Sequence, residues 1–124
     1  MNQIPYDERV KVYKEAAETF GKGNQLVVAI EELSEVQKEL CKALRDEADI
    51  YHIAEEVADA TIMLEQVRQI FSINDEVCKV MDAKIARLHR RVETEKAHRT
   101  ARRELIRKTF TKVFGKKKEA ETND

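Results

Sequence analysis

Apolar residues recur every three or four positions along most of the chain, which is the spacing of one face of an α-helix. This spacing predicts a first helix over residues 6–20, a second over 25–44 and a third over 50–71. A fourth helix is predicted from about residue 75 to about residue 108. Polar turns separate the four segments, and glycine and proline are rare, so the pattern favours an all-α protein.

The breaks between the predicted helices carry capping residues. Pro5 suits the first turn of the first helix, because the N–H that proline lacks is not needed there. Residues 21–24 contain two glycines and Asn24, so we expect glycine to end the first helix and Asn24 to cap the second. A polar turn is expected at residues 45–49.

The second and third predicted helices differ in how much apolar surface they carry. The main apolar stripe of the second helix consists of Leu26, Ile30, Leu33, Leu40 and Leu44. The third helix has apolar residues at heptad spacing, namely Ile53, Val57, Ala60, Leu64, Val67 and Phe71, and further apolar residues beside them. We therefore expect the third helix to be buried on two sides.

Two short acidic motifs lie on these two helices. Each motif holds a carboxylate pair three residues apart, Glu32 with Glu35 and Glu56 with Asp59, and this spacing places both members on one helix face. A helical hairpin can bring the two pairs together, and four like charges at close range repel strongly unless a cation lies among them. Hard divalent cations such as Mg2+ prefer oxygen ligands. The motifs therefore predict a metal site.

The competing interpretation is an exposed acidic face that lysines neutralise. Lys38 and Lys42 lie close enough to Glu35 in the sequence to do this. We favour the metal site because the helix that carries Glu56 and Asp59 is predicted to be buried, and buried carboxylates need a partner, a proton or a metal.

Charge is divided unevenly along the chain. The net charge is −1, yet residues 76–124 hold 15 basic and 8 acidic residues, and residues 1–75 hold 8 basic and 16 acidic residues. An acidic half that binds a metal and a basic half that binds an anion suit a metal–phosphate ligand, although a solvated charged surface has the same asymmetry. We do not expect nucleic acid as a partner, because the acidic half opposes duplex binding.

The composition limits the size of the core. With 38% charged and 6% aromatic residues, 124 residues form a thin core, so we expect a homodimer or homotetramer.

The first ten residues lack the apolar run of a signal peptide, and no apolar stretch of about 18 residues follows. We therefore expect a cytoplasmic protein that does not contact a membrane.

Cys41 and Cys78 are not spaced as a metal-binding pair, and we expect them to be reduced core residues.

The acidic motifs also resemble those of a known family. Glu31-Glu32-x-x-Glu35, followed after a spacer by Glu56-x-x-Asp59, is similar to the signature of the MazG-like, all-α nucleoside triphosphate pyrophosphohydrolases. Each pair alone is common in helices, and the combination carries the resemblance.

Flanking residues extend the resemblance over roughly residues 20–93. Gln25-Leu26 resembles the lead-in to the family's acidic motif. Lys84-x-x-Arg87-x-x-Arg90 resembles the basic stretch that follows the helical hairpin in MazG domains.

The resemblance implies both a fold and a reaction. The fold is a four-helix bundle-type all-α NTP pyrophosphatase, working as an oligomer. The reaction is hydrolysis of NTPs or dNTPs to a nucleoside monophosphate and pyrophosphate, by attack of a metal-activated water on the α-phosphorus. The implied ligands of Mg2+, or of Mn2+ in its place, are Glu32, Glu35, Glu56 and Asp59.

Other residues receive roles from the same resemblance. Glu31 and Glu55 are candidates to orient the water or to act as general base. Lys84, Arg87 and Arg90 are expected to offset phosphate charge, and their alternative is a solvated helix face.

The sequence leads to three further expectations, which concern the role of His52, the extent of the enzyme domain and the alternatives to an enzyme. His52 shares a helix face with Glu56 and Asp59, so it is a candidate ligand or hydrogen-bond partner, although a polar residue at a helix start is the commoner role. The enzyme domain is expected to cover residues 1–108, followed by a basic, disordered tail over 109–124. The alternatives to the enzyme are a non-catalytic helical interaction protein with a basic tail and a related phosphoribosyl-ATP-type pyrophosphohydrolase.

Overall fold

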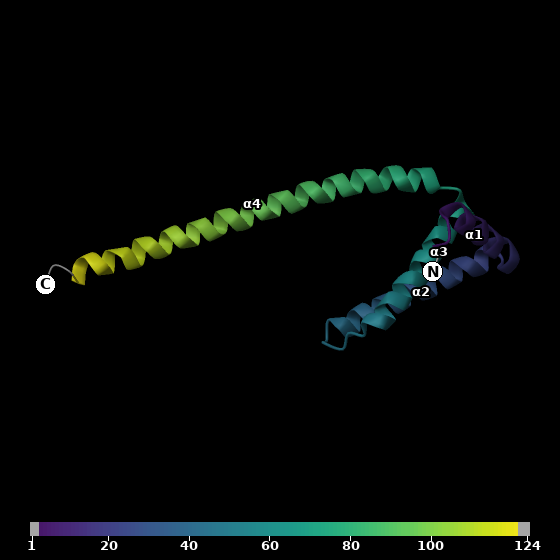
Figure 1. Cartoon of the computed structure of the whole chain (residues 1–124), viewed down its shortest axis with the longest axis horizontal. Coiled ribbons are helices and arrows are strands. Elements are labelled where there is room, and N and C mark those ends of the chain that lie inside the picture. Colours follow the sequence, from purple (N-terminus) through teal and green to yellow (C-terminus); the bar gives the residue numbers. More distant parts are fainter. Residues whose placement is uncertain (1–2, 122–124) are drawn as a thin grey trace. The chain divides into compact units, whose positions relative to one another are not determined.

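A computed structural model describes the backbone of residues 3–121 and the side chains of residues 3–115. Within this range the chain forms four α-helices and no strand, which confirms the all-α class (Figure 1). The helices are α1 (Tyr6–Phe20), α2 (Lys22–Ala43), α3 (Ile50–Phe71) and α4 (Asn74–Glu121). The chain divides into two units, of which the first extends to Val77 and the second begins at Cys78.

A single residue, Gly21, separates α1 from α2. Its φ of +91° is a conformation that side chains rarely adopt, and its N–H donates to the Ala17 carbonyl at 3.1 Å. Asn24, predicted to cap the second helix, instead lies within the first turn of α2, and its Nδ2 donates to the Phe20 carbonyl at 2.9 Å. Because glycine makes the whole turn alone, α2 begins at Lys22, earlier than predicted.

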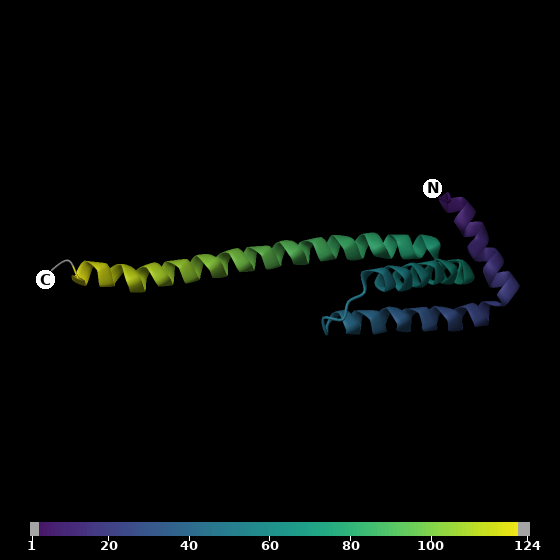
Figure 2. The same cartoon turned by 60° about the horizontal axis from the view of Figure 1, so that its bottom comes forward.

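Helices α2 and α3 form an antiparallel hairpin, and α1 lies across the end where α2 begins and α3 ends (Figure 2). Asp49 caps α3, because its Oδ1 accepts from the backbone N–H groups of Tyr51 at 3.0 Å and His52 at 3.2 Å. The bounds of α1 and α3 match those predicted from the apolar spacing.

A buried hydrogen bond shows the register of the hairpin. Gln25 Nε2 on α2 donates to Gln66 Oε1 on α3 at 3.0 Å. Because the helices are antiparallel and rise equally per residue, each step along α2 is matched by a step back along α3. Glu32 therefore falls level with Asp59, so the register itself brings the two acidic motifs together.

The core of the first unit is small and partly polar. Its buried apolar residues are Tyr13, Ala17, Ala29, Ala60 and Met63, and its buried polar residues are Gln25, Glu39 and Gln66. The alanines leave little volume between the helices, so the backbones approach closely and polar side chains fill part of the interface.

Most of the predicted apolar stripe of α2 faces outward, whereas Leu26 is half-buried. Ile30 is 68% exposed and Leu44 is 87% exposed. Helix α2 packs against α3 with the side that carries Glu32 and Glu39 instead. The expectation that the third helix is buried on two sides is also wrong for the single chain, because Val57 and Leu64 on α3 are exposed.

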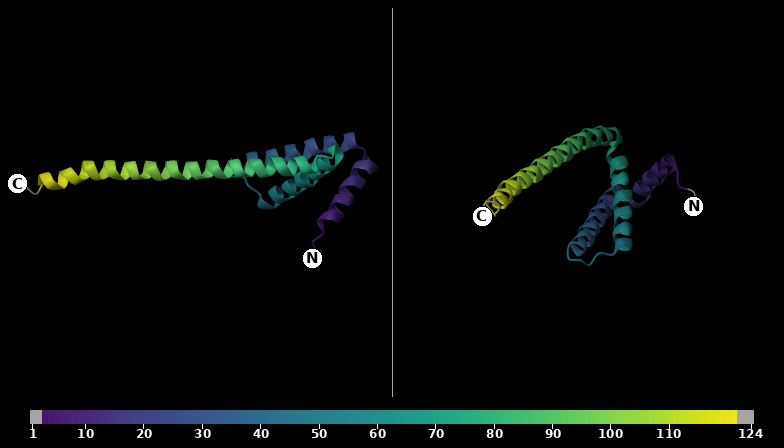
Figure 3. Two further views of the ribbon diagram at one scale, coloured as in Figure 1. Left: turned by 90° about the horizontal axis from the view of Figure 1, so that it is seen from above. Right: turned by 60° about the vertical axis from the view of Figure 1, so that its left-hand side comes forward.

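Helix α4 is one continuous helix of 48 residues (Figure 3). It continues through residues 109–121, which were predicted from the sequence as a disordered tail, and residues 122–124 lie outside the described range. The run after residue 108 contains no proline and only one glycine, Gly115, and it is rich in lysine, so the helix is not interrupted. Among the described residues no helix is long and apolar enough to cross a membrane.

Both cysteines lie at the surface rather than in the core. Cys41 on α2 and Cys78 on α4 are free and exposed. The prediction of core positions is wrong for Cys41 because α2 turns its other side toward α3. It is wrong for Cys78 because this part of α4 exposes its apolar residues as well as its charged ones.

Candidate metal centre

Three carboxylates from the two acidic motifs converge across the hairpin. One carboxylate oxygen each from Glu32 on α2 and from Glu56 and Asp59 on α3 lie within 4.8 Å of one another. Oxygens that share one Mg2+ ion lie about 3–4 Å apart, so a small side-chain adjustment brings this set to ligand geometry. Glu32 and Glu56 are half-buried and Asp59 is exposed, so the burial predicted for Asp59 is not found in the single chain.

The negative charges of these three carboxylates repel one another. Burial raises the pKa of Glu32 above its ordinary value of 4.5, and the negative charges of Asp59 and Glu56 raise it further. Glu31 and Glu35 on the same helix add smaller contributions to this pKa. A hard divalent cation among these oxygens would relieve the repulsion, and three carboxylates are a suitable donor set for it.

Glu35, the fourth predicted ligand, is held by a lysine. Its Oε2 accepts a hydrogen bond from Lys38 Nζ at 2.9 Å. That hydrogen bond and the charge of Glu35 raise the pKa of Lys38, and the charges of Glu39 and Glu56 raise it further. Lys38 therefore lies among acidic groups of both helices. Glu35 can join a metal only by leaving Lys38, and its role as a ligand stays a prediction.

Glu39 is a buried carboxylate that sequence reasoning left out of the site. It is 5% exposed, its Oε1 accepts from Lys42 Nζ at 2.7 Å, and its Oε2 has no hydrogen-bond partner among the described residues. Its position seven residues after Glu32 on the acidic flank was the available signal. Only the structure shows that this acidic flank faces α3, so the sequence alone did not mark Glu39 as a buried residue of the site.

The two candidate general bases differ in their surroundings. Glu31 is exposed, and its negative charge contributes to the raised pKa of Glu32. Glu55 Oε2 lies 3.3 Å from His52 Nδ1, and both side chains are exposed. His52 therefore pairs with Glu55 and does not belong to the carboxylate trio.

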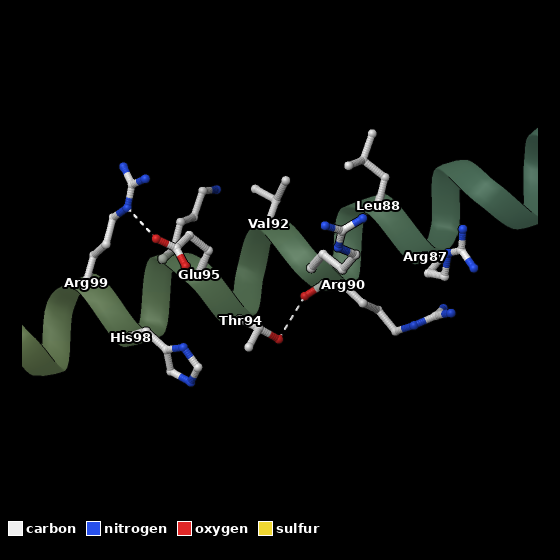
Figure 4. Close-up of a pocket in the computed structure, with 10 residues that line it drawn as sticks. Arg87, Leu88, Arg90, Val92, Thr94, Glu95, His98 and Arg99 are labelled. Atoms are coloured by element: carbon white, nitrogen blue, oxygen red, sulfur yellow. Dashed lines mark hydrogen bonds and ion pairs between the residues drawn. The ribbon is translucent and has the colours of Figure 1, made fainter.

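The predicted phosphate-binding residues lie on α4, in the second unit. Lys84, Arg87 and Arg90 are all exposed. Arg87 and Arg90 line a shallow groove along α4 that reaches Arg99 (Figure 4). Their role stays a prediction, because they belong to a different unit from the carboxylates.

Comparison of the chain with protein-family models, with curated proteins and with solved structures found no match. The candidate metal centre is therefore argued from its own geometry and charge. The likeness of the acidic motifs to the MazG-like signature remains a likeness of residues and spacing.

Proposed function

We propose that this chain is a Mg2+-dependent nucleoside triphosphate pyrophosphohydrolase, which converts an NTP or dNTP into a nucleoside monophosphate and pyrophosphate. The observation that carries the proposal is the convergence of Glu32, Glu56 and Asp59 within 4.8 Å. The likeness of the acidic motifs to the MazG-like signature names the reaction. In this proposal the fold is the bundle-type all-α NTP pyrophosphatase fold, and the enzyme works as a homodimer or homotetramer.

Glu32, Glu56 and Asp59 would hold the metal. Glu35 would be a fourth ligand if it gave up its contact with Lys38. Bound Mg2+, or Mn2+ in its place, supplies positive charge to the triphosphate oxygens and makes water easier to deprotonate. The acidic trio alone would repel a triphosphate, so the cation is also what allows the substrate to bind there.

The reaction breaks one bond and forms another at the α-phosphorus. The water oxygen bonds to this phosphorus, and the bond from it to the oxygen that bridges to the β-phosphorus breaks. Pyrophosphate leaves with the bonding electrons. Glu31 or Glu55 accepts the proton of the water. We favour Glu31, because Glu55 already pairs with His52.

In this proposal the basic residues of α4 interact with the negative charge of the substrate. Lys84, Arg87 and Arg90 provide positive charge that offsets the charge of the triphosphate and of the leaving pyrophosphate. Because this region is basic and the first 75 residues are acidic, the chain provides groups for the cation and for the anion of a metal–nucleotide complex.

Self-association is supported by the outward apolar residues of the first unit. Ile30, Leu33 and Leu40 on α2, with Val57 and Leu64 on α3, are all exposed. Burying such side chains is favourable by about 1.5–3 kcal/mol for each fully buried residue. A second copy of the chain is the partner proposed for these surfaces.

The decisive experiment measures turnover by the purified full chain with Mg2+ and a panel of NTPs, dNTPs and phosphoribosyl-ATP. We expect equimolar pyrophosphate and nucleoside monophosphate, which distinguishes this cleavage from loss of the terminal phosphate. Glu56→Gln should reduce turnover by about 100-fold or more while circular dichroism stays helical. Glu18→Gln, an equivalent change at an exposed position on α1, should leave turnover unchanged.

The result that contradicts the proposal is a wild-type chain that cleaves no nucleotide and binds neither Mg2+ nor Mn2+ in calorimetry. That result would favour the second candidate, a non-catalytic helical interaction protein. The observation behind this candidate is the length of α4, a 48-residue helix whose described side chains from Cys78 onward are all exposed. Cleavage of phosphoribosyl-ATP alone would instead favour the related metabolite hydrolase.

A further inference from the structure

Helix α4 carries an exposed seam at heptad spacing. From Cys78 to Val113, residues alternately three and four positions apart lie on one side of the helix. The seam begins with five apolar residues, Cys78, Met81, Ile85, Leu88 and Val92, and all five are exposed. A seam with this repeat is the sequence requirement for pairing two helices in a left-handed coiled coil.

The middle of the seam is charged, and its far end is again mostly apolar. Glu95, Arg99 and Arg102 follow the first apolar part, and Ile106, Thr109 and Val113 lie beyond them. Leu88 is 56% exposed and Ile106 is 58% exposed, so both apolar parts contact solvent. Figure 4 shows Leu88, Val92 and Arg99 projecting from the same side of α4. The two apolar parts therefore flank a charged centre in which the acidic residue precedes the basic ones.

We propose that α4 pairs with α4 of a second copy of this chain in antiparallel orientation. In the register that pairs the opposite charges of the seam, Glu95 lies level with the partner's Arg99. By symmetry, Arg99 lies level with the partner's Glu95. In this register Leu88 lies level with the partner's Ile106, and Met81 lies level with the partner's Val113. Between them, Ile85 lies level with the partner's Thr109, whose methyl group can pack against it. Acid therefore meets base in the centre, and mostly apolar residues meet at both ends.

Among the residues whose side chains the structure describes, one apposition in this register joins an apolar residue to a charged one. Val92 lies level with the partner's Arg102. The aliphatic part of an arginine can cover a valine while its guanidinium stays in water, so this contact is tolerated.

Other arrangements of the same two helices place like charges together or bury charge against apolar residues. In a parallel pair, each seam residue meets its own counterpart, so Glu95, Arg99 and Arg102 would each face an identical charge. An antiparallel pair shifted by one heptad places Arg99 against the partner's Arg102. A shift the other way places all three charged residues of the seam against apolar residues of the partner, namely Glu95 against Val92 of the partner subunit, Arg99 against the partner's Leu88 and Arg102 against the partner's Ile85. Like-charge contacts of this kind weaken association strongly. The charge pattern therefore selects one orientation and one register.

The residues beside the seam limit the strength of this pairing. Lys84 falls near the partner's Lys112, and the two positive charges repel. We expect a dissociation constant on the order of micromolar, which sets the protein concentration at which the pairing is tested. The proposal does not depend on the proposed hydrolase activity, because the carboxylates on which that activity rests, Glu32, Glu56 and Asp59, take no part in the pairing.

Thiol crosslinking of the full chain tests the orientation. In a background with Cys41→Ser and Cys78→Ala, one chain carries Leu88→Cys and a second, mass-tagged chain carries Ile106→Cys. A short bismaleimide should join the two chains in the mixture. Either chain alone should crosslink at least tenfold less, because two copies of residue 88 would lie about 27 Å apart in the proposed register. The matched control is Ala83→Cys mixed with Thr111→Cys, a pair that is level in this register but on the outer sides of the helices.

Two results would overturn the proposal. Efficient crosslinking of Leu88→Cys with itself would show parallel pairing. No crosslinking of the mixture at tens of micromolar protein would show that α4 does not pair, including the case in which its seam packs against its own chain.

A charge exchange tests the register and separates contacts between chains from contacts within one helix. Glu95 Oε1 and Arg99 Nε already form an ion pair at 2.7 Å within α4, so single substitutions change both. We add Glu95→Arg to the Leu88→Cys chain and either Glu95→Arg or Arg99→Glu to the Ile106→Cys chain. Two Glu95→Arg chains should crosslink on the order of tenfold less than the unsubstituted pair.

The mixed pair should crosslink about as well as the unsubstituted pair, although the ion pair within each helix remains broken. Recovery can then come only from contacts between chains, since arginines at 95 and 99 of one chain face glutamates at 95 and 99 of the other. Equal loss in both mixtures would contradict the register.

Discussion

Glu32 is the residue on which the charge balance of the candidate metal centre depends most. Its pKa lies above the ordinary 4.5 because burial and the charges of Asp59 and Glu56 disfavour the carboxylate. A group whose pKa is raised on folding holds its proton more tightly in the folded state. Without metal, its contribution to stability is therefore present below pH 4.5 and is lost as pH rises through the folded-state pKa.

The first prediction follows from this sign. In EDTA, replacing Glu32 with Gln should remove a decrease in the free energy of unfolding that the wild type shows as pH rises from about 4.5. Mg2+ at 100 times its dissociation constant should stabilise the wild type at neutral pH by about 2.7 kcal/mol. Urea denaturation at several pH values measures both effects. The same pH dependence in the variant and in the wild type would contradict the role assigned to Glu32.

Lys38 provides a second test at the residue scale, because it competes with a cation for Glu35. Its Nζ lies 2.9 Å from Glu35 Oε2, and its charge also interacts with Glu56 across the hairpin. Lys38→Met should tighten binding of Mg2+ or Mn2+ about two- to fivefold, measured by calorimetry. Lys14→Met, an equivalent change at an exposed position on α1, should leave the affinity unchanged. Weaker cation binding in Lys38→Met would show that this lysine supports the site.

At the scale of the helices, local signals were enough to predict where α1 and α3 begin and end. The start of α3 follows the polar turn predicted at residues 45–49, although its cap, Asp49, was recognised only in the structure. The packed face of α2 could not be recognised in this way. Its apolar stripe was the natural candidate, but α3 packs against the side that carries Gln25, Ala29 and Glu32. The spacing of apolar residues shows that a helix has an apolar face. Which face of that helix packs against a second helix depends also on the residues of the second helix.

The hydrogen bond between Gln25 and Gln66 gives the prediction at this scale. Gln25→Ala leaves the buried Gln66 Oε1 without its donor, so it should lower the free energy of unfolding by about 1–3 kcal/mol. Gln37→Ala, at an exposed position of the same helix, should change it by less than about 0.5 kcal/mol. A double-mutant cycle in urea with Gln66→Ala measures the coupling. Additive effects of the two substitutions would show that this contact does not help to hold the hairpin in register.

At the scale of the whole molecule, the chain exposes apolar residues on both of its units. The outward stripe of α2 and the seam of α4 are far apart in the sequence and belong to different units. The sequence indicated self-association from the thin core but not which residues carry it, because the same apolar stripe can pack within a chain or between chains. The structure reduces this ambiguity, since it identifies the apolar residues that the single chain leaves exposed.

The last prediction separates these two surfaces. Leu40→Asp changes an exposed residue of α2, so the fold of the single chain should tolerate it with little loss of helix content. If the α2 stripe is buried between copies, the substitution places a charge in an apolar interface, and the mass measured by sedimentation equilibrium should fall. Crosslinking between residues 88 and 106 should continue, because the α4 seam is unchanged. An unchanged mass would show that the stripe is not an interface, whereas loss of the crosslink would show that the two contacts depend on each other.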